Sequence, residues 1–284
     1  MLKSNFYGFI GCDADYEDAK QVIFGAPFDS TTSYRPGTRF ASKAIRSESF
    51  GIETYSPYQD KDLADCKIFD YGDLELPFGD TRRALDQIRE LAATVLRDDK
   101  IPVMLGGEHL VSLGVFEAVH AKYPDVCIIH FDAHCDLRED YLGCRLSHAS
   151  VIRRCYDIIG DDRIYQFGIR SGDREEFEFS RQGHTFMNKY NLNGLDEIIE
   201  KLQDKKVYFT VDLDVLDPSV FAGTGTPEAG GITFTELMNA IVKICSGLNI
   251  AGCDLVELCP GLDQSGVSTA VACKLLRELL LALQ

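Results

Sequence analysis

The amino-acid sequence predicts an α/β fold in which a parallel sheet is covered by helices on both faces. Short apolar runs rich in β-branched and aromatic residues alternate along the chain with longer segments of helical periodicity. The run at 126–131 is almost continuously apolar, which is typical of a strand buried on both faces. No internal repeat, low-complexity tract or linker interrupts the 284 residues, so we expect a single domain over residues 1–284.

Strand and helix candidates follow one another in regular order. The strands are expected at residues 20–27, 66–71, 101–105, 126–131, 163–169, 184–187, 206–211 and 250–258. The helices are expected at residues 38–50, 81–98, 110–123, 173–180, 195–202, 233–246 and 265–283, with one more that begins near Ser147. In the first helix Phe40, Ala44 and Ile45 are expected to face inward, and Thr233 with Glu236 forms a capping box.

Composition and charge exclude several classes of protein. Apolar residues make up 45% and charged residues 26% of the chain, as in ordinary globular proteins. The net charge of -16 argues against nucleic-acid and anionic membrane partners and favours a cationic substrate. No stretch reaches the ~18 apolar residues of a membrane span, and residues 1–20 lack the apolar core of a signal peptide. The ten scattered cysteines include no CxxC pair, so we expect free thiols and a cytoplasmic protein.

The stretch 128–136, IIHFDAHCD, carries an apolar strand directly into three polar side chains. Asp132, His134 and Asp136 occupy alternate positions at its end. Burying two ionised carboxylates without a partner would cost several kcal/mol per group, so we expect a cation beside them. The competing interpretation is that Asp132 caps a loop, His134 is a hydrogen-bonded core histidine and Asp136 is solvated.

Two further strand ends carry side chains of the same kind. Asp212 and Asp214 follow the strand at 206–211, and Gly106, Gly107 and His109 follow the strand at 101–105. Open α/β sheets bind ligands outside the carboxyl ends of their strands, so we expect these groups to meet at one edge of the sheet.

Together these strand ends supply two imidazoles and four carboxylates as candidate metal ligands. They are His109, Asp132, His134, Asp136, Asp212 and Asp214. Four carboxylates suit two divalent ions that share bridging ligands, roughly 3.5 to 4 Å apart and able to supply hydroxide for hydrolysis. Oxygen-rich coordination favours Mn²⁺ or Mg²⁺ over Zn²⁺, and the imidazoles favour Mn²⁺. An EF-hand is excluded because Asp217 stands where that loop needs glycine. Dinucleotide, Walker A and GxSxG motifs are likewise not found.

Six motifs, in order along most of the chain, carry a resemblance to a known family. They are GGEH at 106–109, FDAHCD at 131–136, SHAS at 147–150, DLDVLDPS at 212–219, GTGTPEAGG at 223–231 and DLVELCP at 254–260. The chain resembles the ureohydrolase family of arginases and agmatinases. The loop LREDYLGCRLSHAS and the glutamate of TGTPEAGG are more similar to agmatinases than to arginases.

This resemblance implies a three-layer α/β/α fold with an eight-stranded parallel sheet and two Mn²⁺ ions per chain. By position it implies that His109 and Asp136 complete the coordination of one ion, and His134 and Asp214 that of the other. Asp132 and Asp212 would bridge the two ions. It also implies a homo-oligomer, commonly a trimer or hexamer in the family.

The same resemblance assigns catalytic and substrate-binding residues. His148 matches a histidine that carries protons to the leaving amine, Glu257 a carboxylate that holds the guanidinium, and Thr226 a threonine of the guanidinium pocket. Asp214 would accept a hydrogen bond or proton from the attacking hydroxide. The competing interpretations make His148 a solvated residue at a helix start, Glu257 a carboxylate with a buried partner and Thr226 a turn hydroxyl.

The expected reaction is hydrolysis of agmatine to putrescine and urea by a hydroxide held between two manganese ions, a step of polyamine biosynthesis. The alternatives are other guanidino substrates, namely guanidinobutyrate, arginine and formiminoglutamate. The loop after the metal motif carries Arg138, Glu139 and Asp140, and Arg138 could meet a substrate carboxylate. A single-zinc deacetylase and a non-catalytic binding protein remain as rival classes.

Other features of the sequence receive no functional role. His120 and His130 are interpreted as core or surface histidines and Cys135 as a small packed residue. The apolar tail from Leu275 is either the last core helix or an interface.

Overall fold

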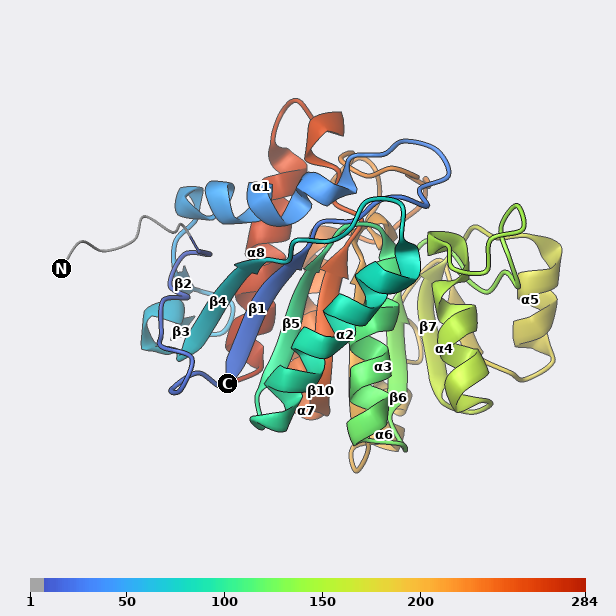
Figure 1. The fold of residues 1–284 in the computed structure, drawn as a ribbon, viewed down its shortest axis with the longest axis horizontal. Helices are drawn as coiled ribbons and strands as arrows, with labels where there is room; N and C mark the ends of the chain where they lie inside the picture. The colour runs from blue at the N-terminus through green and yellow to red at the C-terminus, as the bar shows by residue number, and fades with distance from the viewer. Residues whose placement is uncertain (1–7) are drawn as a thin grey trace.

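The structure, a computed structural model, describes residues 8–284. Within them eight strands form one parallel sheet in the order β4-β1-β5-β10-β9-β6-β7-β8 (Figure 1). The strand bounds are Gln21–Ala26 for β1, Ile68–Asp73 for β4, Ile101–Gly106 for β5, Cys127–Phe131 for β6, Ile164–Ile169 for β7, Phe186–Lys189 for β8, Lys206–Asp212 for β9 and Asn249–Val256 for β10. The sequence predicts no secretion signal in residues 1–20, and residues 1–7 of that segment lie outside the described part of the chain.

Helices cover both faces of the sheet, which confirms the predicted three-layer α/β/α fold (Figure 1). One layer holds α2 (Thr81–Arg97), α3 (Ser112–Lys122) and α4 (Val151–Ile159); the other holds α1 (Ala41–Glu48), α6 (Leu195–Leu202), α7 (Phe234–Gly247) and α8 (Val267–Ala282). Successive strand residues face opposite layers, so Tyr208 packs in one core and Phe209 in the other. Fully burying one such apolar side chain contributes about 1.5 to 3 kcal/mol.

Capping boxes open two of the helices, and the sequence predicted one of them. The Thr233 hydroxyl accepts from the N–H of Glu236, and the Glu236 carboxylate accepts from the N–H of Thr233, so the capping box of α7 is confirmed. A second capping box, between Asp173 and Glu176, opens α5 (Arg174–Arg181). The Glu176 carboxylate also accepts from the N–H of Leu137, which ties α5 to the loop after β6.

The prediction that Phe40 faces inward is wrong, because its side chain is 60% exposed. A 3-10 turn, η1 (Thr38–Phe40), precedes α1 and rotates Phe40 away from the buried face, while Thr38 and Ile45 are buried. The hairpin of β2 (Tyr55–Ser56) and β3 (Lys61–Asp62) was not predicted, since strands of two residues leave no periodic signal.

The apolar tail of the chain forms a core helix. In α8 the side chains of Leu275, Leu276, Leu279 and Leu280 are fully buried. Of the two interpretations of this tail, the last core helix therefore accounts for its leucines. No helix within residues 8–284 combines the length and apolarity needed to cross a membrane.

The order of the central strands prepares the candidate site. Strands β5, β10, β9 and β6 are neighbours, and all run in the same direction. Their carboxyl ends therefore meet at one edge of the sheet, where open parallel sheets bind ligands. The last residues of these strands and the segments that follow them carry every metal-ligand candidate that the sequence predicts.

Candidate metal centre and substrate pocket

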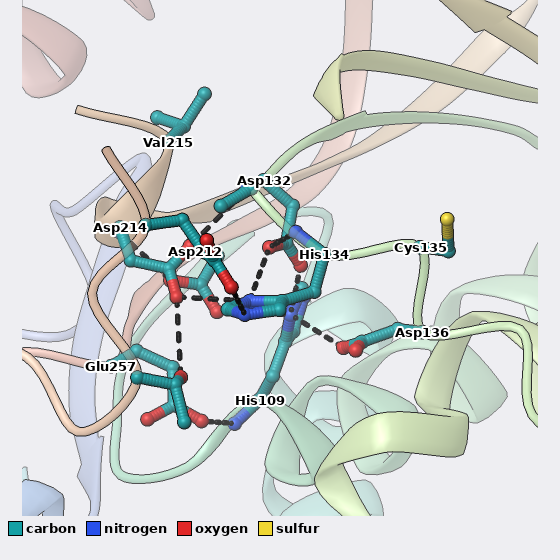
Figure 2. A network of polar contacts seen from close by, with 12 residues as sticks. His109, Asp132, His134, Cys135, Asp136, Asp212, Asp214, Val215 and Glu257 are labelled. Carbon is teal, nitrogen blue, oxygen red and sulfur yellow. Dashed lines mark hydrogen bonds and ion pairs between the residues drawn. The ribbon is translucent and has the colours of Figure 1, made fainter. Parts of the chain in front are cut away.

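Two imidazoles and four carboxylates from separate strand ends meet beyond the edge of the sheet (Figure 2). His109 is buried, and its Nδ1 is 3.0 Å from Asp132 Oδ2, 3.2 Å from Asp136 Oδ2 and 3.3 Å from Asp212 Oδ2. We refer to His109 and Asp136, with the Oδ2 atoms of Asp132 and Asp212, as the deep half of the centre.

The outer half of the centre consists of His134 and Asp214. His134 Nδ1 lies 3.1 Å from Asp214 Oδ2 and 3.4 Å from Asp132 Oδ1. Asp132 therefore faces the two histidines with different oxygens, as a carboxylate shared between two cations would. The His134 side chain is 23% exposed, whereas that of His109 is 1% exposed.

Short-range backbone hydrogen bonds orient the carboxylates. Asp132 Oδ1 accepts from the N–H of His134 at 2.6 Å, and Asp212 Oδ1 accepts from the N–H of Asp214 at 2.9 Å. Each is an Asx turn, which the D-x-H and D-x-D spacings allow. Asp136 has a left-handed backbone with a φ of 53°, a conformation that non-glycine residues rarely adopt and that clusters at functional sites.

A buried hydrogen-bond chain determines which nitrogen of His109 faces the carboxylates. Thr210 Oγ1 lies 2.9 Å from His109 Nε2 and donates to Asp254 Oδ1 at 2.7 Å, and the Tyr208 hydroxyl also donates to Asp254. Because Thr210 gives its only proton to a carboxylate, it accepts from Nε2–H, so in the neutral ring it is the Nδ1 lone pair that faces the cluster.

Sequence reasoning missed Thr210 and Asp254, as well as a third imidazole. His130, to which we assigned no role, is buried with its Nε2 2.8 Å from Asp132 Oδ2. A recognisable signal existed, because His130 and Thr210 each stand two positions before a candidate ligand, Asp132 just after β6 and Asp212 at the end of β9. Cys135 lies between two candidate ligands in the sequence, but its sulfur points away from the cluster (Figure 2).

The charge of the cluster is not balanced by basic side chains. Within residues 8–284, no lysine or arginine forms an ion pair with these four carboxylates. Burial, with the negative charges of Asp214 and Asp132, raises the pKa of Asp212 well above its usual range. Burial lowers the pKa of His109, but hydrogen bonds to three carboxylates outweigh it and raise that pKa well above its usual range. A buried cluster of carboxylates that no lysine or arginine of residues 8–284 neutralises is suited to binding divalent cations.

A pocket of about 200 Å³ opens beside the outer half and is lined in part by His134, His148, Ser33 and Thr226. The N–H of Ser33 donates to His148 Nε2 at 3.2 Å, and Ser33 Oγ lies 3.0 Å from the same nitrogen. Sequence reasoning missed Ser33, which lies in the polar loop after β1. Burial, followed by the charges of His134 and His109, lowers the pKa of His148 to about 4.

Glu257 and Thr226 complete the set predicted from the sequence. Glu257 Oε1 accepts from the N–H of His109 at 2.7 Å and lies 3.8 Å from His148 Nδ1 (Figure 2). Burial raises the pKa of Glu257 well above its usual range, and its φ of 65° is left-handed. Thr226 Oγ1 lies 3.4 Å from Asp214 Oδ2, at the limit of hydrogen bonding.

Arg138 lies in the pocket wall with its charge already paired. One of its terminal nitrogens is 2.8 Å from Asp173 Oδ2, and its Nε is 3.6 Å from Glu176 Oε2. Glu139 and Asp140, its neighbours in the loop, are exposed, and Asp140 accepts from the N–H of Gly143.

Comparison with known proteins agrees with this fold. A profile described as the Arginase family matches residues 19–282. The agmatinase of Bacillus cereus is 50% identical over 275 residues, 96% of this chain and 95% of the relative. The human mitochondrial guanidino acid hydrolase is 33% identical over 279 residues, 94% of this chain and 79% of the relative. The crystal structure of the agmatine ureohydrolase of Thermoplasma volcanium superimposes with a TM-score of 0.90 at 35% identity, covering 99% of this chain and 95% of that one.

Fold and site thus define a three-layer α/β/α protein with a carboxylate- and imidazole-lined centre at the carboxyl edge of its sheet. The chain belongs to the arginase family and is a ureohydrolase similar to bacterial agmatinases.

Proposed function

We propose that the chain hydrolyses agmatine to putrescine and urea with two Mn²⁺ ions. The observation that carries this proposal is the cluster of two imidazoles and four carboxylates beside a pocket of about 200 Å³, which His134 and Asp136 of the cluster line. The 50% identity with the Bacillus cereus agmatinase supports the choice of substrate. As part of the same proposal, the enzyme serves polyamine synthesis as a cytoplasmic homo-oligomer.

The residues of the centre fit two divalent ions. The deep half would hold one ion through His109 and Asp136, the outer half would hold the other through His134 and Asp214, and Asp132 and Asp212 would contact both. Two such ions, when bound, lower the pKa of a water molecule so that hydroxide is available near neutral pH, and their charge stabilises a tetrahedral transition state.

The chain's own residues would orient the substrate and move its protons. Among the described residues no backbone N–H donates to Glu257 Oε2, so this oxygen can accept from a guanidinium held above the cluster. The N–H of Ser33 donates to His148 Nε2, so the ring proton of the neutral imidazole sits on Nδ1, on the side of Glu257. A neutral His148 can take up a proton and pass one to the departing amine.

The pairing of Arg138 favours a cationic substrate tail over an anionic one. Asp173 and Glu176 together carry one more charge than the arginine they flank, so this wall of the pocket has a surplus of negative charge. A substrate carboxylate would have to displace Asp173 from Arg138, whereas an ammonium group would meet an attractive field. This supports agmatine over guanidinobutyrate.

Urea release by the manganese-loaded protein tests the proposal with agmatine, arginine, guanidinobutyrate and formiminoglutamate measured side by side. We expect agmatine to be preferred at least tenfold in kcat/KM, about 1.4 kcal/mol in transition-state stabilisation. Preference for a guanidino acid would overturn the substrate and keep the chemistry. A single zinc per chain, or no urea from any substrate, would overturn the chemistry itself.

Two variants test the roles of the pocket residues. Glu257→Gln keeps the shape but removes the charge that holds the guanidinium, and His148→Asn keeps a polar group but cannot shuttle a proton. We expect each to lose on the order of 100-fold or more in kcat/KM. Wild-type rates in either variant would remove that residue from the mechanism.

A further inference from the structure

A row of polar side chains crosses the buried sheet directly beneath the metal centre. Asp254, Thr210, His130 and Gln166 stand side by side on β10, β9, β6 and β7, each in register with the next. All four are buried in a sheet that is otherwise strongly apolar. Buried polar groups are costly unless they are hydrogen-bonded, so the partners within this row indicate what it does.

His130 joins the row to the centre. Its Nε2 lies 2.8 Å from Asp132 Oδ2, and its Nδ1 lies 3.1 Å from Gln166 Nε2. Donor atoms of His130, His109 and Asp132 lie within 4.8 Å of one another, close enough for His130 itself to be a metal ligand. The protonation of its two nitrogens decides between ligand and hydrogen-bond donor, because a ligating nitrogen cannot carry a proton.

Gln166 decides this protonation. Its Nε2 donates to the carbonyl oxygen of Cys135 at 2.8 Å, and its Oε1 accepts from the Thr185 hydroxyl at 3.2 Å. Rotating the amide by half a turn would set Oε1 against the Cys135 carbonyl, two acceptors facing each other. The amide nitrogen therefore also faces His130 and donates to Nδ1. In the neutral ring Nδ1 then has no proton, and Nε2–H donates to Asp132.

We propose that His130 is a positioning residue that holds the shared carboxylate of the centre by a hydrogen bond and is not itself a metal ligand. This inference rests on the proposed function, because it takes Asp132 as a ligand. His130 fixes Oδ2 of Asp132, while the N–H of His134 fixes Oδ1. Both oxygens are therefore held in place before an ion arrives. Removing a partner that orients a metal ligand in this way typically lowers metal affinity by roughly 10- to 100-fold.

Two substitutions separate the hydrogen bond from packing. His130→Phe fills the same space without a donor, and His130→Gln keeps an amide N–H near the position of Nε2. His120→Phe is the matched control, since His120 lies half-buried on α3 away from the centre. Manganese affinity of the metal-free proteins is measured by calorimetry, and thermal unfolding of the same proteins reports whether each variant folds.

We expect His130→Phe to weaken manganese binding about 10- to 100-fold, and His130→Gln and His120→Phe to stay within about threefold of the parent. Electron spin echo spectroscopy should count the same number of manganese-coupled imidazole nitrogens in the parent and in all three variants. Equal affinity in His130→Phe would overturn the positioning role. A loss of one coupled imidazole in both His130 variants would overturn it in favour of a ligand.

Nitrogen NMR of the metal-free protein tests the assigned tautomer without any ion. We expect the Nδ1 resonance of His130 to show an unprotonated nitrogen and Nε2 a protonated one; the reverse pattern would overturn the proposal. Failure of the proposed function looks different, because the parent protein would then bind fewer than two manganese ions or release no urea from guanidino compounds.

Discussion

The deep and outer halves of the centre are built from the same residue types but are held very differently. Both nitrogens of His109 have partners, Thr210 on one side and three carboxylates on the other, and the ring is buried. His134 has carboxylates at Nδ1, but within residues 8–284 the only partner of its Nε2 is Glu228, 3.9 Å away and partly exposed. The deep half is therefore pre-organised by the sheet, and the outer half is open to the pocket.

Because of this difference, we expect the two halves to have different roles in metal binding and turnover. A ligand whose ring is fixed on both sides loses little freedom when it binds an ion, so the deep half should bind more tightly. The outer half adjoins His148 and the pocket, where a substrate must enter and a product must leave. Its looser support suits a site that has to adapt during turnover.

The largest effect is expected from removing the carboxylate that the deep and outer halves share. Asp132→Ala takes away one oxygen from each half, so we expect both ions to be lost and the rate of urea release to fall on the order of 1000-fold or more. Metal content after desalting and kcat are the measurements. One ion retained at the parent's affinity would show that the halves are independent.

Staged removal of metal with a chelator tests which half of the centre binds its ion more tightly. We expect one of the two ions to leave first, with a dissociation constant at least tenfold weaker, a difference of about 1.4 kcal/mol. His134→Asn should abolish the weaker event and leave the tighter one. If His134→Asn abolishes the tighter event, the assignment of strong and weak halves is reversed.

The hydrogen bond beneath His109 can be removed without touching a proposed ligand. Thr210→Val keeps the shape but leaves His109 Nε2 without its acceptor and takes one donor from Asp254, so we expect a loss of about 1 to 3 kcal/mol in stability. The tighter manganese site should weaken about tenfold. Thr226→Val is the matched change beside the outer half and should affect only the weaker site. Equal effects of the two variants would contradict the distinction.

The smallest expected effect concerns the loop that carries Thr226. Asp217 accepts hydrogen bonds from Ser219 and from the N–H groups of Gly230 and Gly231, and these bonds lower its pKa to about 2. Because this folded pKa lies below the ordinary value of about 3.9, the carboxylate stabilises the fold above pH ~4 and stops doing so as the pH falls through about 2.

Asp217→Asn should therefore lower Tm at pH 7 by no more than about 2 °C, since the group is partly exposed to solvent, and the difference from the parent should shrink at pH 3. Manganese binding in the deep half should not change. A difference in Tm that grows toward low pH would contradict the assignment of Asp217 as a carboxylate anchor.

Local patterns in the sequence were sufficient for the elements and for the candidate residues at the strand ends. Apolar runs and helical periodicity located the eight strands of the parallel sheet and the eight α-helices to within a few residues over the described chain. The alternate spacing of Asp132 and His134 already implied that both leave a strand in the same direction, because successive residues of an extended chain point to opposite sides. Phe40 failed because a 3-10 turn changed the helical phase, which the sequence pattern does not show.

Only the tertiary structure decided how these residues meet. The order β5-β10-β9-β6 pairs strands that lie between 43 and 150 residues apart in the chain, and no local period encodes that pairing. The register of β6 with β7 and β9 sets His130 beside Gln166 and Thr210, and the capping box of α5 brings Asp173 to Arg138. The sequence by itself determined which chemical groups are available, since residue type and local spacing are written in it. Which side chain holds which ligand candidate, and which nitrogen of a histidine faces it, depends on contacts between distant segments. These contacts exist only once the sheet has formed.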